Sequence, residues 1–184
     1  CIVPSPNEGF VAIDACYYSN IGLKQDGSVV TWPYSYEFKA PAKTVFISVA
    51  AGHSHFLALT KEGVILAWGD FRYGQCAVPY PNKDFVAVAA GYWHSLGLKR
   101  DGSIVAWGQN TNGQCDVPQP NEGFIAIAAG ESHSLALRKD GSIVGWGSNA
   151  YGKCKAPEPN SGYIAIAAGK DHSLALRADG SVVA

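Results

Sequence analysis

A repeat of 39 residues runs through most of this 184-residue chain. Histidine, tryptophan and cysteine recur at this interval, at His55, His94, His133 and His172, at Trp68, Trp107 and Trp146, and at Cys76, Cys115 and Cys154. The first copy is looser, because Trp32 precedes Trp68 by 36 residues and Ser19 stands in the histidine position. Self-similarity at this period is typical of an array of small structural units, each of which packs on its neighbours.

Each copy contains four short runs that are apolar or alternate apolar with polar residues, bounded by Gly, Pro, Asn or Asp. In one copy these runs are residues 124–130, 133–138, 142–147 and 153–157. The Asp140-Gly141 pair between the second and third runs favours a two-residue type I′ hairpin turn. No segment has a helical period. The sequence therefore predicts an all-β fold, a β-propeller built of four-stranded antiparallel blades.

The expected repeats are about 10–41, 42–79, 80–118, 119–157 and 158–184, within a single domain 1–184. Four copies are complete, the last is split or truncated inside its third strand, and residues 1–4 are expected to form an orphan outer strand. Two arrangements fit. Residues 1–4 complete the last blade of a five-bladed ring, or the chain is an arc of a larger ring. An arc has open blade edges, which favour association with copies of itself.

The Ala-Ala-Gly, His-Ser-Leu-Ala-Leu, Asp-Gly-Ser and Trp-Gly series resembles the regulator-of-chromosome-condensation repeat family. The Gly-Gln-Cys-x-Val-Pro segments at 74–79 and 113–118 look most like its lean bacterial members, such as the type II β-lactamase-inhibitor protein. The resemblance implies rings of seven blades, which favours the arc. It also implies recognition of another protein through loop aromatics, although the target of the inhibitor does not transfer.

In an up-and-down meander, the loops between strands one and two and after strand three share one end of every blade. Residues at these loops differ between copies while their flanks repeat, and aromatic side chains gather there. Aromatic residues on loops of a rigid scaffold are common anchors of protein recognition. The candidate protein-binding residues are Tyr17, Tyr18, Tyr34, Tyr36, Phe71, Tyr73, Tyr92 and Trp93. The alternative is that these side chains pack on neighbouring blades.

The opposite end carries the basic residues Lys24, Lys61, Lys99, Arg100, Arg138, Lys139 and Arg177, each near an acidic turn residue. We interpret this end as a solvated surface and expect no nucleic-acid partner, since the net charge of the chain is −1 and no aromatic residues interleave with the cations. No apolar stretch approaches the length of a membrane span, so no membrane partner is expected.

The repeated histidines are not expected to form a metal site, because equivalent positions in different blades point in different directions around the axis. We expect each to hydrogen-bond a backbone group within or beside its own blade. The repeated cysteines are expected to lie too far apart for disulfides, as buried free thiols. Free thiols favour a reducing compartment, whereas the bacterial resemblance favours export, so the localisation stays open.

No nucleophile-elbow, phosphate-loop or metal motif is present, so we predict neither an enzyme nor a cofactor. The predicted function is a non-enzymatic protein-binding propeller of the inhibitor, adhesion or scaffold type. The competing prediction is a structural repeat protein that assembles with itself. Guanine-nucleotide exchange and lectin-like binding of a small molecule are weaker alternatives.

Overall fold

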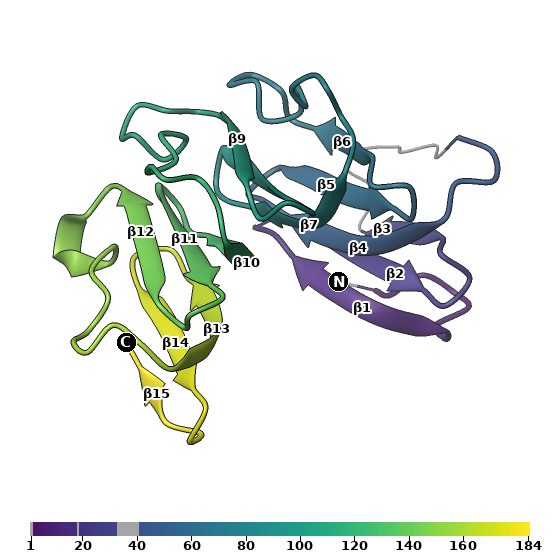
Figure 1. Ribbon diagram of the computed structural model, residues 1–184. Helices are drawn as coiled ribbons and strands as arrows, with labels where there is room; N and C mark the ends of the chain where they lie inside the picture. Colours follow the sequence, from purple (N-terminus) through teal and green to yellow (C-terminus); the bar gives the residue numbers. More distant parts are fainter. Residues whose placement is uncertain (1, 18, 33–40) are drawn as a thin grey trace.

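The computed structural model describes residues 2–17, 19–32 and 41–184. Five antiparallel sheets of three strands each follow one another along an arc (Figure 1). Their strands are β1 (Phe10–Ala15), β2 (Asn20–Lys24) and β3 (Val29–Trp32); β4 (Phe46–Ala51), β5 (His55–Thr60) and β6 (Ile65–Gly69); β7 (Phe85–Ala90), β8 (His94–Lys99) and β9 (Ile104–Gly108); β10 (Phe124–Ala129), β11 (His133–Arg138) and β12 (Ile143–Gly147); β13 (Tyr163–Ala168), β14 (Ser173–Arg177) and β15 (Val182–Val183).

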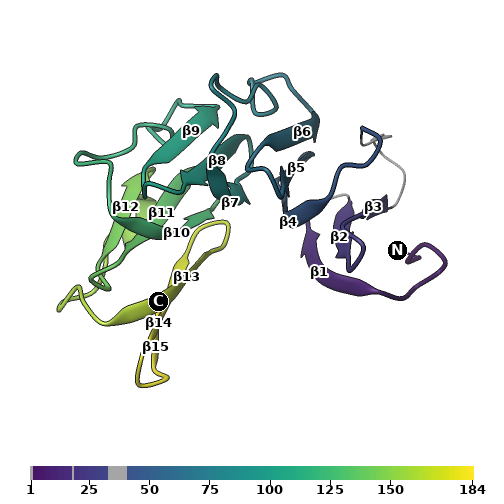
Figure 2. The same cartoon turned by 45° about the vertical axis from the view of Figure 1, so that its right-hand side comes forward.

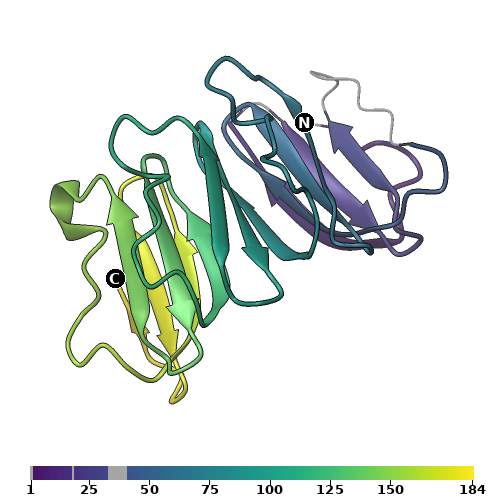
Figure 3. The ribbon, with the colours of Figure 1, turned by 45° about the horizontal axis from the view of Figure 1, so that its top comes forward.

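Each sheet is one copy of the repeat, with its strands in sequence order. The first strands of the blades, β1, β4, β7, β10 and β13, contact one another in series and form the inner side of the arc. The first and last sheets lie at opposite ends of the arc in the turned views (Figures 2 and 3). The structure therefore has the all-β fold and the array of blades that were predicted, but not a closed five-bladed ring.

Helical structure is limited, in the part of the chain that the structure describes, to the single turn η1 (Ala150–Gly152). Within the same residues, no helix has the length and apolar character needed to cross a bilayer.

The predicted fourth strand is wrong, because the described part of every sheet has three strands. Residues 2–4 and the segments after β6 and β9 are turns and irregular chain, and the segment after β12 adds only the single helical turn η1. An asparagine side chain supplies one pair of the hydrogen bonds that a fourth strand would make. Asn121 Oδ1 accepts a hydrogen bond from the N–H of Ile104, and Asn121 Nδ2 donates one to the Ile104 carbonyl, both at 2.8 Å. Asn82 holds Ile65 in the same way, and Asn160 holds Ile143. Prolines in these segments lack the N–H that a further strand needs.

The prediction of a type I′ turn at the Asp-Gly pairs is also wrong, as Asp101-Gly102 shows. At Asp101-Gly102 only the glycine has a positive φ, of 82°, whereas a type I′ turn needs positive φ at both residues. The Gly102 N–H donates to the Lys99 carbonyl at 2.9 Å, and the Asp101 carboxylate accepts bonds from both the N–H and the hydroxyl of Ser103. These bonds to Ser103 hold Asp101 in an ordinary turn, and the glycine that follows takes the left-handed conformation.

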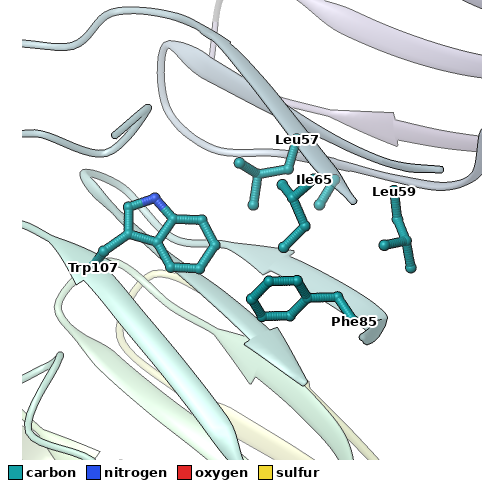
Figure 4. Packing of buried hydrophobic residues seen from close by; sticks show 6 residues of the cluster. Leu57, Leu59, Ile65, Phe85 and Trp107 are labelled. Carbon is teal, nitrogen blue, oxygen red and sulfur yellow. The ribbon is translucent and has the colours of Figure 1, made fainter. Parts of the chain in front are cut away.

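Neighbouring blades pack face to face through apolar side chains. Between the second and third blades, Leu57, Leu59 and Ile65 pack against Phe85 and Trp107 (Figure 4). The next junction repeats this arrangement with Leu96, Leu98 and Ile104 against Phe124 and Trp146. The core is therefore a series of similar junctions, as a repeat array requires.

The outward faces of the first and last blades expose residues that the internal junctions bury. Leu174 is 38% exposed, whereas Leu135, its equivalent one blade earlier, is 3% exposed. On the first blade Ile13 is 74% exposed, although Val88 at the same position of the third blade packs in a core cluster. Both ends of the arc thus present apolar surface.

Candidate functional site

The loops predicted to share one end of the molecule do lie together. Tyr92 and Trp93 join β7 to β8, and Tyr73 lies in the loop after β6. The ring centroids of Tyr73 and Trp93 are 4.8 Å apart, so two different loops meet at this end. This contact supports the assignment of faces that the meander predicts.

A continuous series of five rings, which we call the aromatic row, crosses three blades at this end. It runs from Tyr17 through His53, Tyr92 and Trp93 to Tyr73, with successive ring centroids 5.1, 3.8, 4.5 and 4.8 Å apart. The rings of His53 and Tyr92 are stacked, and those of Tyr92 and Trp93 meet edge to face. Tyr17 is 72% exposed and Tyr73 is 43% exposed, so the row combines packing between blades with an exposed surface.

The candidate residues divide into three groups. The row unites Tyr17, Tyr73, Tyr92 and Trp93. Phe71 is 76% exposed and makes no ring contact among the described residues. Tyr18, Tyr34 and Tyr36 lie outside the described residues.

His53 is a member of the row that the sequence analysis missed. It occupies the variable loop position that holds Tyr17 in the first blade and Tyr92 in the third, which was the signal available. Its Nδ1 lies 2.7 Å from Ser54 Oγ. Burial lowers the pKa of His53, with Asp70 and Glu131 opposing that effect. The imidazole ring of His53 is therefore mainly neutral at pH 7.

Beside the row, the inner strands of all five blades surround a hollow of about 300 Å³, which we call the axial mouth. It is lined by the Ala and Gly residues Ala15, Ala51, Gly52, Ala90, Gly91, Ala129, Gly130, Ala168 and Gly169, and by Cys16, Tyr17, His53, Tyr92, Glu131 and Lys170. Lys170 Nζ lies 3.5 Å from Glu131 Oε2. The mouth thus has aromatic side chains from the first three blades and a charged pair from the last two.

The small residues of the inner strands are needed at this position, as their sequence suggested. A side chain at Gly91 would collide with the ring of His94 and with the Gly130 carbonyl of the next blade. The blades therefore approach closely around the mouth.

The repeated histidines link one blade to the next through serine, not through a backbone group as predicted. His55 Nε2 lies 2.9 Å from Ser95 Oγ, and the Ser95 hydroxyl donates to the Gln75 carbonyl at 2.9 Å. Because the hydroxyl has a single hydrogen, His55 must donate through Nε2. Trp107 Nε1 donates to the same carbonyl at 2.8 Å. We call this arrangement the histidine–serine junction.

The next blades repeat the junction, with His94 bonded to Ser134 and His133 bonded to Ser173. Burial lowers the pKa of His55 to about 4, of His94 to about 3 and of His133 to about 4. These histidines are neutral and structural at pH 7. Among the described residues, no group of three or more His, Cys, Asp or Glu is placed to hold a metal ion.

The described cysteines are free, as expected, but they are partly rather than fully buried. Cys76 Sγ lies 3.1 Å from the Asp70 carbonyl, and Cys115 Sγ lies 3.3 Å from the Gln109 carbonyl. Burial raises the pKa of both thiols to about 11, so they are protonated and poor nucleophiles.

At the opposite end, four of the basic residues lie over aromatic rings of their own blades, at 5.0 to 5.3 Å from the ring centroids. The pairs are Lys24 with Phe10, Lys99 with Phe85, Arg138 with Phe124 and Arg177 with Tyr163. These cations thus pack on the blade as well as meeting solvent.

The sequence model of one protein family, the regulator of chromosome condensation (RCC1) repeat, matches residues 46–75, 85–114 and 124–153. These three blades are similar to RCC1 repeats. Each matched segment begins at the first residue of an inner strand and reaches the residue whose carbonyl accepts the serine bond, namely Gln75, Gln114 and Lys153. Each matched segment therefore contains the histidine of one junction and the carbonyl that accepts the serine bond of that junction.

Solved structures with the same fold are larger proteins. Prp20p from Saccharomyces cerevisiae matches with a TM-score of 0.81 and 22% identity, over 94% of this chain and 57% of that one. The ectodomain of the Arabidopsis thaliana receptor kinase ACR4 matches at 0.77 and 24%, over 98% and 66%. Human WBSCR16 matches at 0.76 and 18%, over 96% and 61%. This chain thus spans less than two thirds of each.

No curated protein matches the chain. The Prp20p structure is described together with the binding of that protein to Gsp1p and histones. The likeness to these structures establishes the RCC1-type propeller fold, and the finer resemblance to bacterial inhibitors stays a prediction.

Proposed function

We propose that this chain is a non-enzymatic protein-binding module and that the aromatic row is the centre of its binding surface. The observation that supports the proposal most directly is the continuity of the row: five rings from three blades contact one another in sequence beside the axial mouth. Such a surface buries much area on binding and loses little side-chain entropy. A propeller of the same fold, Prp20p, is described as binding proteins.

The row meets the usual requirements of a binding centre. Contacts between its rings fix their positions before a partner arrives, which lowers the entropic cost of association. Tyr hydroxyls and the exposed ring faces offer both polar and apolar contacts. Phe71 at 76% exposure extends the apolar surface beyond the row, on the same loop as Tyr73.

The test is the double substitution Tyr92→Ala with Trp93→Ala, measured against a partner first recovered by affinity capture and then purified. Removing two central aromatic anchors is expected to weaken binding by at least about 100-fold, since anchors of this type each contribute roughly 2 kcal/mol or more. The matched control is Tyr80→Ala, because Tyr80 is 97% exposed and lies two residues before Asn82, at the turn end of the blade.

Titration calorimetry on the purified pair gives the affinity, and thermal unfolding of the variants tests their folding. Unchanged affinity in the double variant contradicts the proposal. An equal loss of affinity with Tyr80→Ala also contradicts it, because binding would then not depend on this end of the molecule. A large fall in thermal stability with retained affinity assigns the row to packing between blades.

Self-association is the second candidate, supported by the exposed apolar residues Ile13 and Leu174 on the outward faces of the first and last blades. Light scattering across a concentration series separates it from the first, since a monomer at all concentrations excludes it. The substitution Leu174→Glu is expected to abolish any oligomer that forms through the last blade, because burial of an unpaired carboxylate is costly.

A further inference from the structure

The inner edges of the blades direct backbone N–H groups toward the axial mouth. The Gly52 N–H donates to the His55 carbonyl at 2.8 Å, which makes these residues a hydrogen-bonded pair of β4 and β5. In an antiparallel ladder the neighbouring pair, Ala51 and Phe56, is then not hydrogen-bonded. The N–H of Ala51 therefore points away from its own sheet, on the side of the axis.

The same geometry recurs in the following blades. Gly91, Gly130 and Gly169 donate to the carbonyls of His94, His133 and His172, each at 2.9 Å. Consequently Ala90, Ala129 and Ala168 also turn their N–H groups toward the mouth, which all three residues line. The mouth thus carries one outward backbone donor from each of these blades.

The first junction shows what such donors bind. Asp14 Oδ2 accepts a hydrogen bond from the Ala51 N–H at 2.9 Å, and Asp14 Oδ1 accepts one from the Ala15 N–H at 2.8 Å. One carboxylate therefore bridges the inner edges of two consecutive blades. Burial raises the pKa of Asp14, and the two backbone bonds act against that rise.

The later junctions have the same backbone N–H donors but no side-chain carboxylate at the position of Asp14. Alanine occupies the position of Asp14 in every later blade, at Ala50, Ala89, Ala128 and Ala167. The five sheets are separate, so no strand of another blade pairs with an inner edge. Among the described residues, no side chain accepts a hydrogen bond from the N–H of Ala90, Ala129 or Ala168, and all three residues are partly exposed.

We propose that the axial mouth binds a carboxylate, supplied by an acidic side chain of a protein partner, which bridges the N–H groups of Ala90 and Ala129 as Asp14 bridges those of Ala15 and Ala51. A charged acceptor forms stronger hydrogen bonds with backbone donors than a neutral one does. Two charged side chains also line the mouth: Lys170 favours an anion, while Glu131 opposes it and is paired with Lys170.

The proposal rests on the proposed function for the nature of the partner, but the carboxylate site can be tested without one. The experiment is a titration of the 15N-labelled chain with acetate, followed through the amide resonances in NMR spectra. Acetamide, which has nearly the same shape and no charge, is the control ligand. We expect the amide proton resonances of Ala90 and Ala129 to move downfield with acetate but not with acetamide. The Ala51 resonance is expected not to respond, because the Ala51 N–H already donates to the Asp14 carboxylate.

Two variants sharpen the titration. Asp14→Ala makes the first junction like the others, so the Ala51 amide is expected to begin responding to acetate. Ala89→Asp supplies a carboxylate from within the chain, so the Ala129 amide is expected to lose its response. Should Ala89→Asp disrupt the fold, as judged from the dispersion of the spectrum, Asp14→Ala still decides the outcome.

The proposal is overturned if acetate and acetamide produce equal shifts, if the shifts spread evenly over exposed amides, or if Ala51 fails to respond in Asp14→Ala. These outcomes are independent of the Tyr92 and Trp93 experiment. A failed titration with binding still dependent on the aromatic row refutes the carboxylate site alone. A successful titration with unchanged partner affinity in the double variant refutes the aromatic row alone.

Discussion

The first junction between blades differs from the junctions that follow it. The second and third blades are joined by His55 and Ser95, and the third and fourth by His94 and Ser134, in addition to apolar packing. At the first junction Ser19 stands in the histidine position and Phe56 in the serine position. Phe56 stacks on Trp68 of its own blade, with ring centroids 5.6 Å apart, and both pack in a cluster with Ile21 of the first blade. One scaffold therefore joins its blades either through a buried histidine–serine network or through a buried phenylalanine, with the Asp14 bond to Ala51 at the inner edge.

The two solutions have different physical consequences. A buried hydrogen-bond network fixes geometry and depends on pH, since protonation of a buried histidine is costly. Aromatic packing depends on the area buried, and the titratable group of the first junction is not a histidine but Asp14, whose carboxylate accepts a hydrogen bond from the Ala51 N–H of the second blade. The comparison predicts that the two types of junction respond differently to mutation and to acid.

The largest effect is expected for Phe56→Ala at the first junction. Phe56 is 1% exposed, and loss of a buried phenylalanine costs about 3–5 kcal/mol in the free energy of unfolding. Urea denaturation measures the change. Phe71→Ala is the control, because this phenylalanine is exposed and its removal is expected to change stability by about 0.5 kcal/mol or less. Equal effects of the two substitutions would contradict aromatic packing as the basis of the first junction.

The second largest effect is expected for acid, which should weaken the histidine–serine junctions. The pKa of His94 is lowered from 6.5 to about 3 in the folded chain, so the unfolded chain binds more protons between these values. Stability is therefore fully present above about pH 6.5 and falls as the pH drops, by up to about 1.4 kcal/mol per pH unit for each such histidine.

The variant His94→Gln isolates one of these contributions, because glutamine keeps an N–H donor without a titrating ring. Its unfolding free energy is expected to fall less steeply with decreasing pH than that of the unmodified chain. Urea denaturation at several pH values gives both slopes, and parallel slopes would mean that His94 does not contribute to the acid sensitivity.

A smaller effect is expected for Ser95→Ala. This change leaves the Nε2–H of His55 without its acceptor and removes one donor to the Gln75 carbonyl. An unsatisfied buried polar group costs about 1–3 kcal/mol. Ser142→Ala, on an exposed turn, is the control and is expected to cost less. Thermal or urea unfolding compares the two, and a loss no larger than that of the control would argue against the serine as a link between blades.

The repeat itself made the fold predictable from the sequence. The 39-residue interval, the alternating runs and the variable loop positions located three of the four predicted strands in each blade and the end where the aromatic side chains meet. The hydrogen-bond partner of His55 was harder to predict from the sequence, because Ser95 lies 40 residues away in the next blade. A period in the sequence identifies equivalent positions, but not which neighbour each side chain reaches.

Two local features, the absent fourth strand and the type of the Asp-Gly turn, could not be predicted from the sequence for a different reason. The segment before Asn121 alternates like a strand, yet the amide side chain of Asn121 already satisfies the backbone of Ile104. The Asp-Gly pairs match a type I′ turn, but the hydrogen bonds that Ser103 donates to the Asp101 carboxylate favour another turn. In both cases a short polar side chain competed with the backbone pattern, and sequence periodicity does not report that competition.

The asparagine that closes the outer side of a blade has a consequence for the behaviour of the protein at high concentration. A sheet edge with unpaired backbone groups recruits edges of other molecules and promotes aggregation. Asn82, Asn121 and Asn160 each occupy the backbone groups of one residue of such an edge, and the neighbouring prolines interrupt any incoming strand. A single amide in each of the second, third and fourth blades thus serves as protection against the formation of intermolecular β-structure.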